Sequence, residues 1–259
     1  MANLARAVLE SALRVRKLDR TLTTSLPPPE RGAVAATALE RLDACLQGGL
    51  PRGELSELAG PRSSGRTALA LQILAAATRR GELVALIDTC DRLDVASAAG
   101  AGVDLARLLW IRGQGSDRAQ TTAGRALMEH AVDRALKALA LVLQAGGFGV
   151  VILDLADVPP PVLARHPFAT WLRVQRAVEG RDTACVLVVP EPLARSAGGL
   201  TLSLLGRSGW TGAAARSRRL DRIEMSVRAI APRQRVDGRV NIDATHTDHG
   251  PQRHRGTEG

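Results

Sequence analysis

The sequence has few aromatic residues, with two Phe, three Trp and no Tyr among its 259 residues. Its core must therefore consist mainly of Leu, Val, Ile and Ala, although hydrophobic residues still make up 45% of the chain. Aliphatic cores of this kind are usual where helices cover both faces of a parallel sheet. A chain of this length suits one α/β domain with additional terminal segments.

Cysteine is also scarce, and Cys45, Cys90 and Cys185 form no C-x-x-C pair. Their wide spacing argues against a disulfide framework or a metal cluster, and it favours a reducing cytoplasm. There is no run of eighteen apolar residues, so the sequence predicts no membrane-spanning helix. Arg6 and Arg14 interrupt the first apolar stretch, which argues against a secretory signal.

Lysine is nearly absent, because Lys17 and Lys137 are the two lysines among 35 basic residues. The formal net charge is nevertheless +9, and this excess of arginine favours an anionic partner such as DNA. The alternative is a soluble surface whose arginines reflect the base composition of the genome. Composition alone leaves both interpretations open.

Four segments are predicted along the chain. Residues 1–26 hold an amphipathic helix with apolar positions every three or four residues, and residues 27–32 form a proline-rich linker. Residues 33–230 form the core domain, and residues 231–259, which are polar and nearly free of apolar residues, form a disordered tail. The helix either folds back on the core or docks in a groove of a partner, and the stiff linker favours the partner.

Strands and helices alternate within the core segment. The predicted strands are residues 53–58, 83–88, 108–111, 150–154, 184–189 and 222–230. The predicted helices are residues 67–80, 94–101 and 168–178, with a long helix that Asp117 caps and that ends near residue 143. Such alternation predicts an α/β fold with a mostly parallel central sheet flanked by helices.

A phosphate-binding loop is predicted at residues 60–67, which read Gly60-Pro61-Arg62-Ser63-Ser64-Gly65-Arg66-Thr67. This run matches the pattern G-x-x-x-x-G-K-[ST] except that Arg66 replaces the lysine. The glycines let backbone N–H groups point at a phosphate, and Thr67 has a hydroxyl for Mg²⁺. The Arg66 guanidinium keeps the charge but is planar and wider than an ammonium, so we expect impaired catalysis. Asp154 ends an apolar strand, where such proteins hold the magnesium shell.

These segments resemble the RecA family over about residues 33–230. The similarity is carried by residues 48–54 and 60–67, by residues 86–94, by residues 102–109, and by the strand that ends at Asp154. The resemblance implies a RecA-like P-loop core that takes ATP and Mg²⁺. The altered loop leaves open that the protein binds neither.

Three departures from the RecA pattern affect residues that serve catalysis. Arg66 replaces the lysine, and Cys90 stands where RecA proteins carry a catalytic Glu, with Asp91 beside it. Pro190-Glu191 stands where they carry a nucleotide-sensing Gln. A thiol is a poor substitute for a carboxylate base. We therefore expect no catalytic residue and no enzymatic activity.

This degenerate pattern is similar to ImuA, the RecA-like accessory family of bacterial translesion-synthesis cassettes. That resemblance implies a cytoplasmic role in DNA repair and in damage-induced mutagenesis, within the SOS response. It implies error-prone and Y-family-like polymerase proteins as partners, with RecA as a further candidate. Two alternatives stay open: an active, DNA-dependent ATPase of the recombinase kind, and an inhibitor of cell division.

The resemblance also places two segments where RecA proteins have DNA-binding loops. Residues 157–166 contain three consecutive prolines, so they are too stiff for a flexible loop. Residues 191–222 are rich in Gly, Ser and Arg and are predicted to form a mobile loop that binds single-stranded DNA weakly. The candidate DNA-binding residues are Arg195, Arg207, Trp210, Arg216, Arg218 and Arg219. The alternative is a solvated basic loop that binds no DNA.

Overall fold

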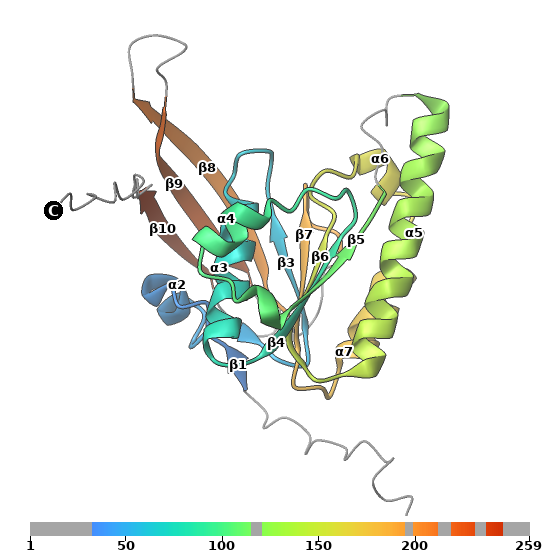
Figure 1. Ribbon diagram of the computed structural model, residues 1–259, viewed down its shortest axis with the longest axis horizontal. Coiled ribbons are helices and arrows are strands. Elements are labelled where there is room, and N and C mark those ends of the chain that lie inside the picture. Colours follow the sequence, from blue (N-terminus) through green and yellow to red (C-terminus); the bar gives the residue numbers. More distant parts are fainter. Residues whose placement is uncertain (1–32, 115–120, 195–198, 212–218, 231–236, 246–259) are drawn as a thin grey trace, which may run out of the picture.

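The computed structural model describes residues 33–114, 121–194, 199–211, 219–230 and 237–245. Their largest feature is an eight-stranded sheet in the order β10-β9-β8-β3-β7-β6-β4-β5, with helices on both faces (Figure 1). The six strands from β8 to β5 are parallel to their neighbours, whereas β9 and β10 are antiparallel additions at one edge. The predicted α/β class with a mostly parallel sheet is confirmed.

The elements follow one another in the alternation that the sequence predicts. The parallel strands are β3 (Leu55–Ala59), β4 (Leu83–Asp88), β5 (Leu108–Arg112), β6 (Phe148–Asp154), β7 (Ala184–Val189) and β8 (Thr201–Thr211). The antiparallel edge consists of β9 (Arg219–Ile230) and β10 (Asp237–Thr245). The helices are α2 (Glu40–Cys45), α3 (Arg66–Arg79), α4 (Val95–Gly100), α5 (Thr122–Ala145), α6 (Pro160–Leu163) and α7 (Phe168–Val178). A small separate sheet pairs β1 (Val34–Ala35) with β2 (Leu50–Pro51).

The helices confirm most of the predicted boundaries. The long helix is an exception, because α5 begins at Thr122 rather than next to Asp117. The Thr121 hydroxyl caps it by accepting the N–H of Gly124 at 3.0 Å, which is the usual role of a threonine at this position. None of the helices in the described residues is both long enough and apolar enough to cross a membrane.

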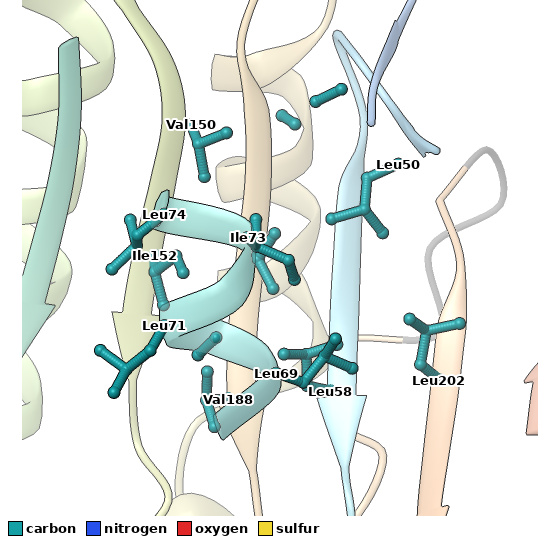
Figure 2. Close-up of a cluster of buried hydrophobic side chains, with 14 of the residues drawn as sticks. Leu50, Leu58, Leu69, Leu71, Ile73, Leu74, Val150, Ile152, Val188 and Leu202 are labelled. Atoms are coloured by element: carbon teal, nitrogen blue, oxygen red, sulfur yellow. The ribbon is translucent and has the colours of Figure 1, made fainter. Parts of the chain in front are cut away.

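The hydrophobic core lies on both faces of the central strands, which are apolar throughout. On one face, α3 places Leu69, Ile73 and Leu74 against Leu58 and Ile152 (Figure 2). On the other face, α5 and α7 cover the same strands. Each large apolar side chain buried in this way contributes about 1.5–3 kcal/mol. The start of α3 is therefore firmly placed relative to the ends of β3 and β6.

The C-terminal segment corrects one prediction. The composition of residues 231–259 predicts a disordered tail, and for Asp237–Thr245 this prediction is wrong, because these residues form β10. β10 pairs with β9 along its whole length, from Asp237 opposite Ile230 to Thr245 opposite Arg222. Backbone hydrogen bonds make this pairing, so a polar composition hides it. The predicted helix at residues 2–24, the linker at 27–32 and residues 246–259 lie outside the described residues.

The predicted mobile loop at residues 191–222 is wrong for residues 201–211 and 219–222. Residues 201–211 form β8 and residues from 219 onward form β9, and the two strands pair antiparallel over their full span. Leu202 and Leu204 are buried while Leu205 is exposed, so β8 alternates as a half-covered strand does. The glycines and serines on both sides of this short apolar run conceal the pattern in the sequence.

Gly206 on β8 lies directly against the phosphate loop. A Cβ atom at this position would lie 2.6 Å from the carbonyl oxygen of Ser63 and 2.8 Å from the Cα of Ser64. Both contacts are with backbone, which cannot rotate away as a side chain can. Only glycine lets β8 approach the loop so closely.

We expect Gly206→Ala to lower the free energy of unfolding by about 1–3 kcal/mol, because the added methyl forces β8 and the loop apart. Gly100→Ala is the matched control, since a Cβ there meets no atom within 4 Å. Urea unfolding of both variants and of the wild type measures the difference. Equal stability of the two variants would contradict the close approach.

Candidate nucleotide site

The phosphate loop joins β3 to α3 at the carboxyl ends of the parallel strands, which is where ligands of such sheets bind. Its backbone turns through two left-handed residues, Ser63 with φ of 60° and Gly65 with φ of 91°. Ser64 donates its N–H to the carbonyl oxygen of Pro61 at 3.2 Å, which closes the turn. Gly65 is the N-cap of α3, so the loop meets the positive end of that helix. The backbone therefore fits a phosphate group.

Met225 on β9 fixes this loop from the other side. A Cβ atom at Gly65 would overlap the sulfur of Met225, which is buried. The loop is thus packed between α3 and the β8–β9 edge of the sheet. Its shape depends on neighbouring strands as well as on its own glycines.

Arg66 is the residue that replaces the lysine of the motif, and it is only 6% exposed. Its Nη1 donates to the carbonyl oxygen of Ala156, just after β6, at 3.4 Å. Burial lowers the pKa of Arg66 from its ordinary value, and the charges of Asp154 and Asp157 oppose that shift. The guanidinium is therefore directed at the chain after β6 and at the carboxylates there.

Asp154 ends β6, as the sequence predicts, and its Oδ1 accepts the N–H of Ala156 at 2.8 Å. Burial raises the pKa of Asp154 to about 6, although the N–H of Ala156 opposes the shift, and the nearby charges of Asp88 and Asp157 raise it further. The carboxylate is thus mostly ionised at neutral pH but costs stability there. Its position and its oxygens fit a place in a magnesium shell.

Asp157, three residues after Asp154, binds two arginines that the sequence places far away from it. Its Oδ1 lies 2.9 Å from Nη2 of Arg62, which belongs to the phosphate loop. Its Oδ2 lies 3.6 Å from Nε of Arg92, which follows β4. The first cation of the loop is therefore already paired with a carboxylate of the same chain.

The turn after β4 is held by the buried carboxylate of Asp88. It accepts the N–H groups of Arg92 and Leu93 at 2.9 and 2.8 Å and the indole N–H of Trp110 at 3.2 Å. Cys90 lies in this turn, with its sulfur 4.0 Å from that of Met128. Burial raises the pKa of the Cys90 thiol to about 12, and the neighbouring aspartates add to the shift. A thiol that stays protonated at neutral pH cannot act as the base.

Asp91 cannot take over this role, because Arg112 on β5 binds its carboxylate. Arg112 donates from Nε and Nη2 to the two oxygens of Asp91 at 2.8 Å each, and it also stacks 4.6 Å from the ring centroid of Trp110. These hydrogen bonds hold the pKa of Asp91 below its usual range. The carboxylate is thus held by the edge strand β5.

Glu57 is a buried charged residue of β3 that the sequence analysis did not single out. Its carboxylate accepts the N–H groups of Leu193, at 3.1 Å, and of Ala194, and the hydroxyl of Thr201 at 3.3 Å. It thereby ties the segment after β7 to the strand that enters the phosphate loop. Glu191 in the same segment is exposed. A charged residue within an apolar strand was the signal available in the sequence.

The candidate DNA-binding residues are placed only in part. Arg207 and Trp210 belong to β8, and Arg219 begins β9, so these three lie on a hairpin rather than in a loop. Arg195, Arg216 and Arg218 lie outside the described residues. Whether these residues bind DNA stays a prediction.

A strand, a glycine-rich phosphate loop and a helix, with a parallel strand that ends in Asp lying one strand further along the sheet, define a P-loop fold of the nucleotide-binding class. Within that class, residues 31–154 match the family model of the RecA N-terminal domain. Curated relatives include the RecA protein of Chlorobium limicola, which is 38% identical over 143 residues, covering 54% of this chain and 40% of that protein. The RecA protein of Chlorobium chlorochromatii is 31% identical over 143 residues, covering 54% of this chain and 39% of that protein.

The chain therefore spans about two fifths of the length of these RecA relatives. A solved structure, that of the RadB recombinase, aligns with 83% of this chain and 96% of its own, at a TM-score of 0.50 and 18% identity. The likeness to RadB shows the fold. Together the comparisons relate this chain to the RecA superfamily.

We expect Asp154→Asn to raise stability at about pH 7.5 by roughly 1–3 kcal/mol. The pKa of Asp154 is raised to about 6 from 3.8, so the folded state holds its proton more tightly than the unfolded state. The folded state thus carries a charge penalty above pH 6 that disappears as the pH falls toward 4. Urea unfolding should show the gain at about pH 7.5 and none near pH 4. A destabilised variant at the higher pH would contradict this account, and Asp104→Asn, at an exposed site, is the control.

Proposed function

We propose that this protein is a RecA-like accessory protein of bacterial DNA repair that acts through protein contacts rather than through ATP hydrolysis. One observation carries the proposal: each group that hydrolysis needs is occupied or chemically unsuited. Arg66 is directed at the Ala156 carbonyl, the Cys90 thiol is protonated, and Asp91 is bound by Arg112.

Phosphoryl transfer to water needs a group that positions or deprotonates the water and a cation at the terminal phosphate. Such positioned acid–base groups contribute about 10²–10⁴-fold to the rate. The loop backbone, Thr67 and Asp154 fit a bound nucleotide with Mg²⁺. The nucleotide would supply the phosphoryl group for transfer. Cys90, which aligns with the catalytic Glu of RecA proteins, and Asp91 beside it do not fit the role of the base in that transfer. This combination of residues supports nucleotide binding without hydrolysis.

The finer role that we propose is in translesion synthesis during the SOS response, with error-prone and Y-family-like polymerase proteins as partners. This part rests on the resemblance of the degenerate RecA pattern to the ImuA family. RecA and single-stranded DNA are further proposed partners. The basic hairpin of β8 and β9 is the segment where we would place contact with DNA.

The alternative is an active DNA-dependent ATPase, which the intact loop backbone and Asp154 favour. The two functions differ in their response to Arg66→Lys. Our proposal predicts background turnover for the wild type and for Arg66→Lys, with or without single-stranded DNA, because Cys90 still provides no base. A coupled ATPase assay measures this. DNA-stimulated turnover that rises in Arg66→Lys and disappears in Asp154→Ala would establish the alternative.

A tagged form of the full chain, purified from DNA-damaged cells with and without nuclease, tests the partners. We expect mass spectrometry to find an error-prone or Y-family-like polymerase that survives nuclease treatment, because the proposed contact is between proteins. Untagged cells are the control. Recovery of nothing but nuclease-sensitive proteins would contradict the adaptor role and would move the basic hairpin to the centre of the function.

A further inference from the structure

The Asp157 carboxylate lies next to arginine side chains that a bound phosphate would use. One of its oxygens faces Arg62 at 2.9 Å and the other faces Arg92 at 3.6 Å. Arg66 is close enough for Asp157 to act on its charge, and so is Cys90. Residues from the phosphate loop, from the turn after β4 and from the segment after β6 thus meet at this one carboxylate.

The charges of the site balance one another. Three positive charges come from Arg62, Arg66 and Arg92. Three negative charges come from Asp88, Asp154 and Asp157. The Asp88 carboxylate also holds the turn after β4 by accepting backbone N–H groups. The loop is therefore cationic in sequence but internally compensated in the folded protein. The side chains around an incoming phosphate therefore offer it no net positive charge while all three carboxylates stay in place.

The Arg62–Asp157 pair is the one most open to exchange. The side chain of Arg62 is 80% exposed and that of Asp157 is 29% exposed, and ion pairs at such surfaces are weak. A phosphate offers Arg62 more acceptor oxygens than the one carboxylate oxygen that it contacts here, and two guanidinium N–H groups can bind a phosphate at once. Leu155 and Val158 on either side of the Asp157 turn are buried, so the exchange requires only rotation of the side chain.

We propose that Asp157 is a tethered competitor of phosphate, which holds Arg62 and must leave it before a nucleotide phosphate binds to the loop. The proposal rests on the phosphate site of the proposed function but not on the absence of hydrolysis or on any protein partner. Asp157 sets the nucleotide affinity of the chain, because only the fraction of molecules with Arg62 released is competent to bind. The polyphosphate group, rather than the base or sugar, is the part of the ligand that Asp157 discriminates against.

The test is nucleotide affinity of the full chain, measured by isothermal titration with ADP, once with Mg²⁺ and once with EDTA. Asp157→Asn keeps the size of the side chain and removes its charge, and we expect it to bind ADP about two- to fivefold more tightly in both conditions, the range that a surface ion pair can contribute. Asp104→Asn is the matched control. Asp104 pairs with Arg107 at 3.3 Å just before β5 begins, at the amino end of the strands, so its affinity should equal that of the wild type.

A double-mutant cycle identifies Arg62 as the group that Asp157 holds. Arg62→Gln combined with Asp157→Asn should lose most of the gain seen in Asp157→Asn alone, because the released guanidinium is what binds phosphate. Thermal unfolding of each variant confirms that it is folded.

Four results would overturn the proposal. The first three are unchanged or weaker ADP binding by folded Asp157→Asn, a gain that survives the removal of Arg62, and no binding by Asp157→Asn at about 5 mM ADP. A gain that appears with Mg²⁺ but not with EDTA also contradicts it, because competition for arginine does not involve the metal. ATP turnover by any of these variants would sink the non-hydrolytic function while leaving the competitor role intact, so the two failures are distinguishable.

Discussion

The close packing of the phosphate loop against β8 and β9 is the constraint on which the site depends. Gly206 lets β8 reach the loop backbone, and Gly65 leaves room for the sulfur of Met225. On the other side, α3 anchors the end of the loop through Leu69 and its neighbours in the core. The loop therefore keeps the shape that suits a phosphate without any contribution from Arg66 or from the carboxylates beyond it.

The same scaffold explains why the chemistry of the site can change while the fold does not. Asp91 and Cys90 project from a turn whose geometry is set by the buried carboxylate of Asp88. The Cys90 side chain takes part in neither of the Asp88 hydrogen bonds, so a thiol in place of a carboxylate does not remove them. Arg66 likewise finds a carbonyl acceptor after β6. The fold and the catalytic groups are maintained by separate sets of contacts.

The sequence was sufficient for the parallel strands β4, β6 and β7, because each is a continuous apolar run. It was insufficient for β8 and β10, whose glycine-containing or polar sequences form strands by pairing with β9. Strand pairing depends on the neighbouring strand, which the local sequence pattern does not identify. The prolines at residues 159–161 were interpreted correctly as stiff, and α6 begins at them.

Within the site, motif matching located the loop, Thr67 and Asp154 but not the partners that decide what they do. Arg62 and Asp157 are 95 residues apart in the sequence, and Arg112 reaches Asp91 across 21 residues. Such pairs arise from the order of strands in the sheet. A single sequence specifies the charges but not which of them meet.

The buried carboxylate of Glu57 has a consequence for how contact with another molecule would be felt. It holds Leu193 and Ala194 from within β3, three residues before the phosphate loop begins. Any contact that displaces Leu193 and Ala194 would therefore act directly on the strand that carries the loop. The segment after β7 and the strand that enters the phosphate loop are in this way joined through one buried carboxylate.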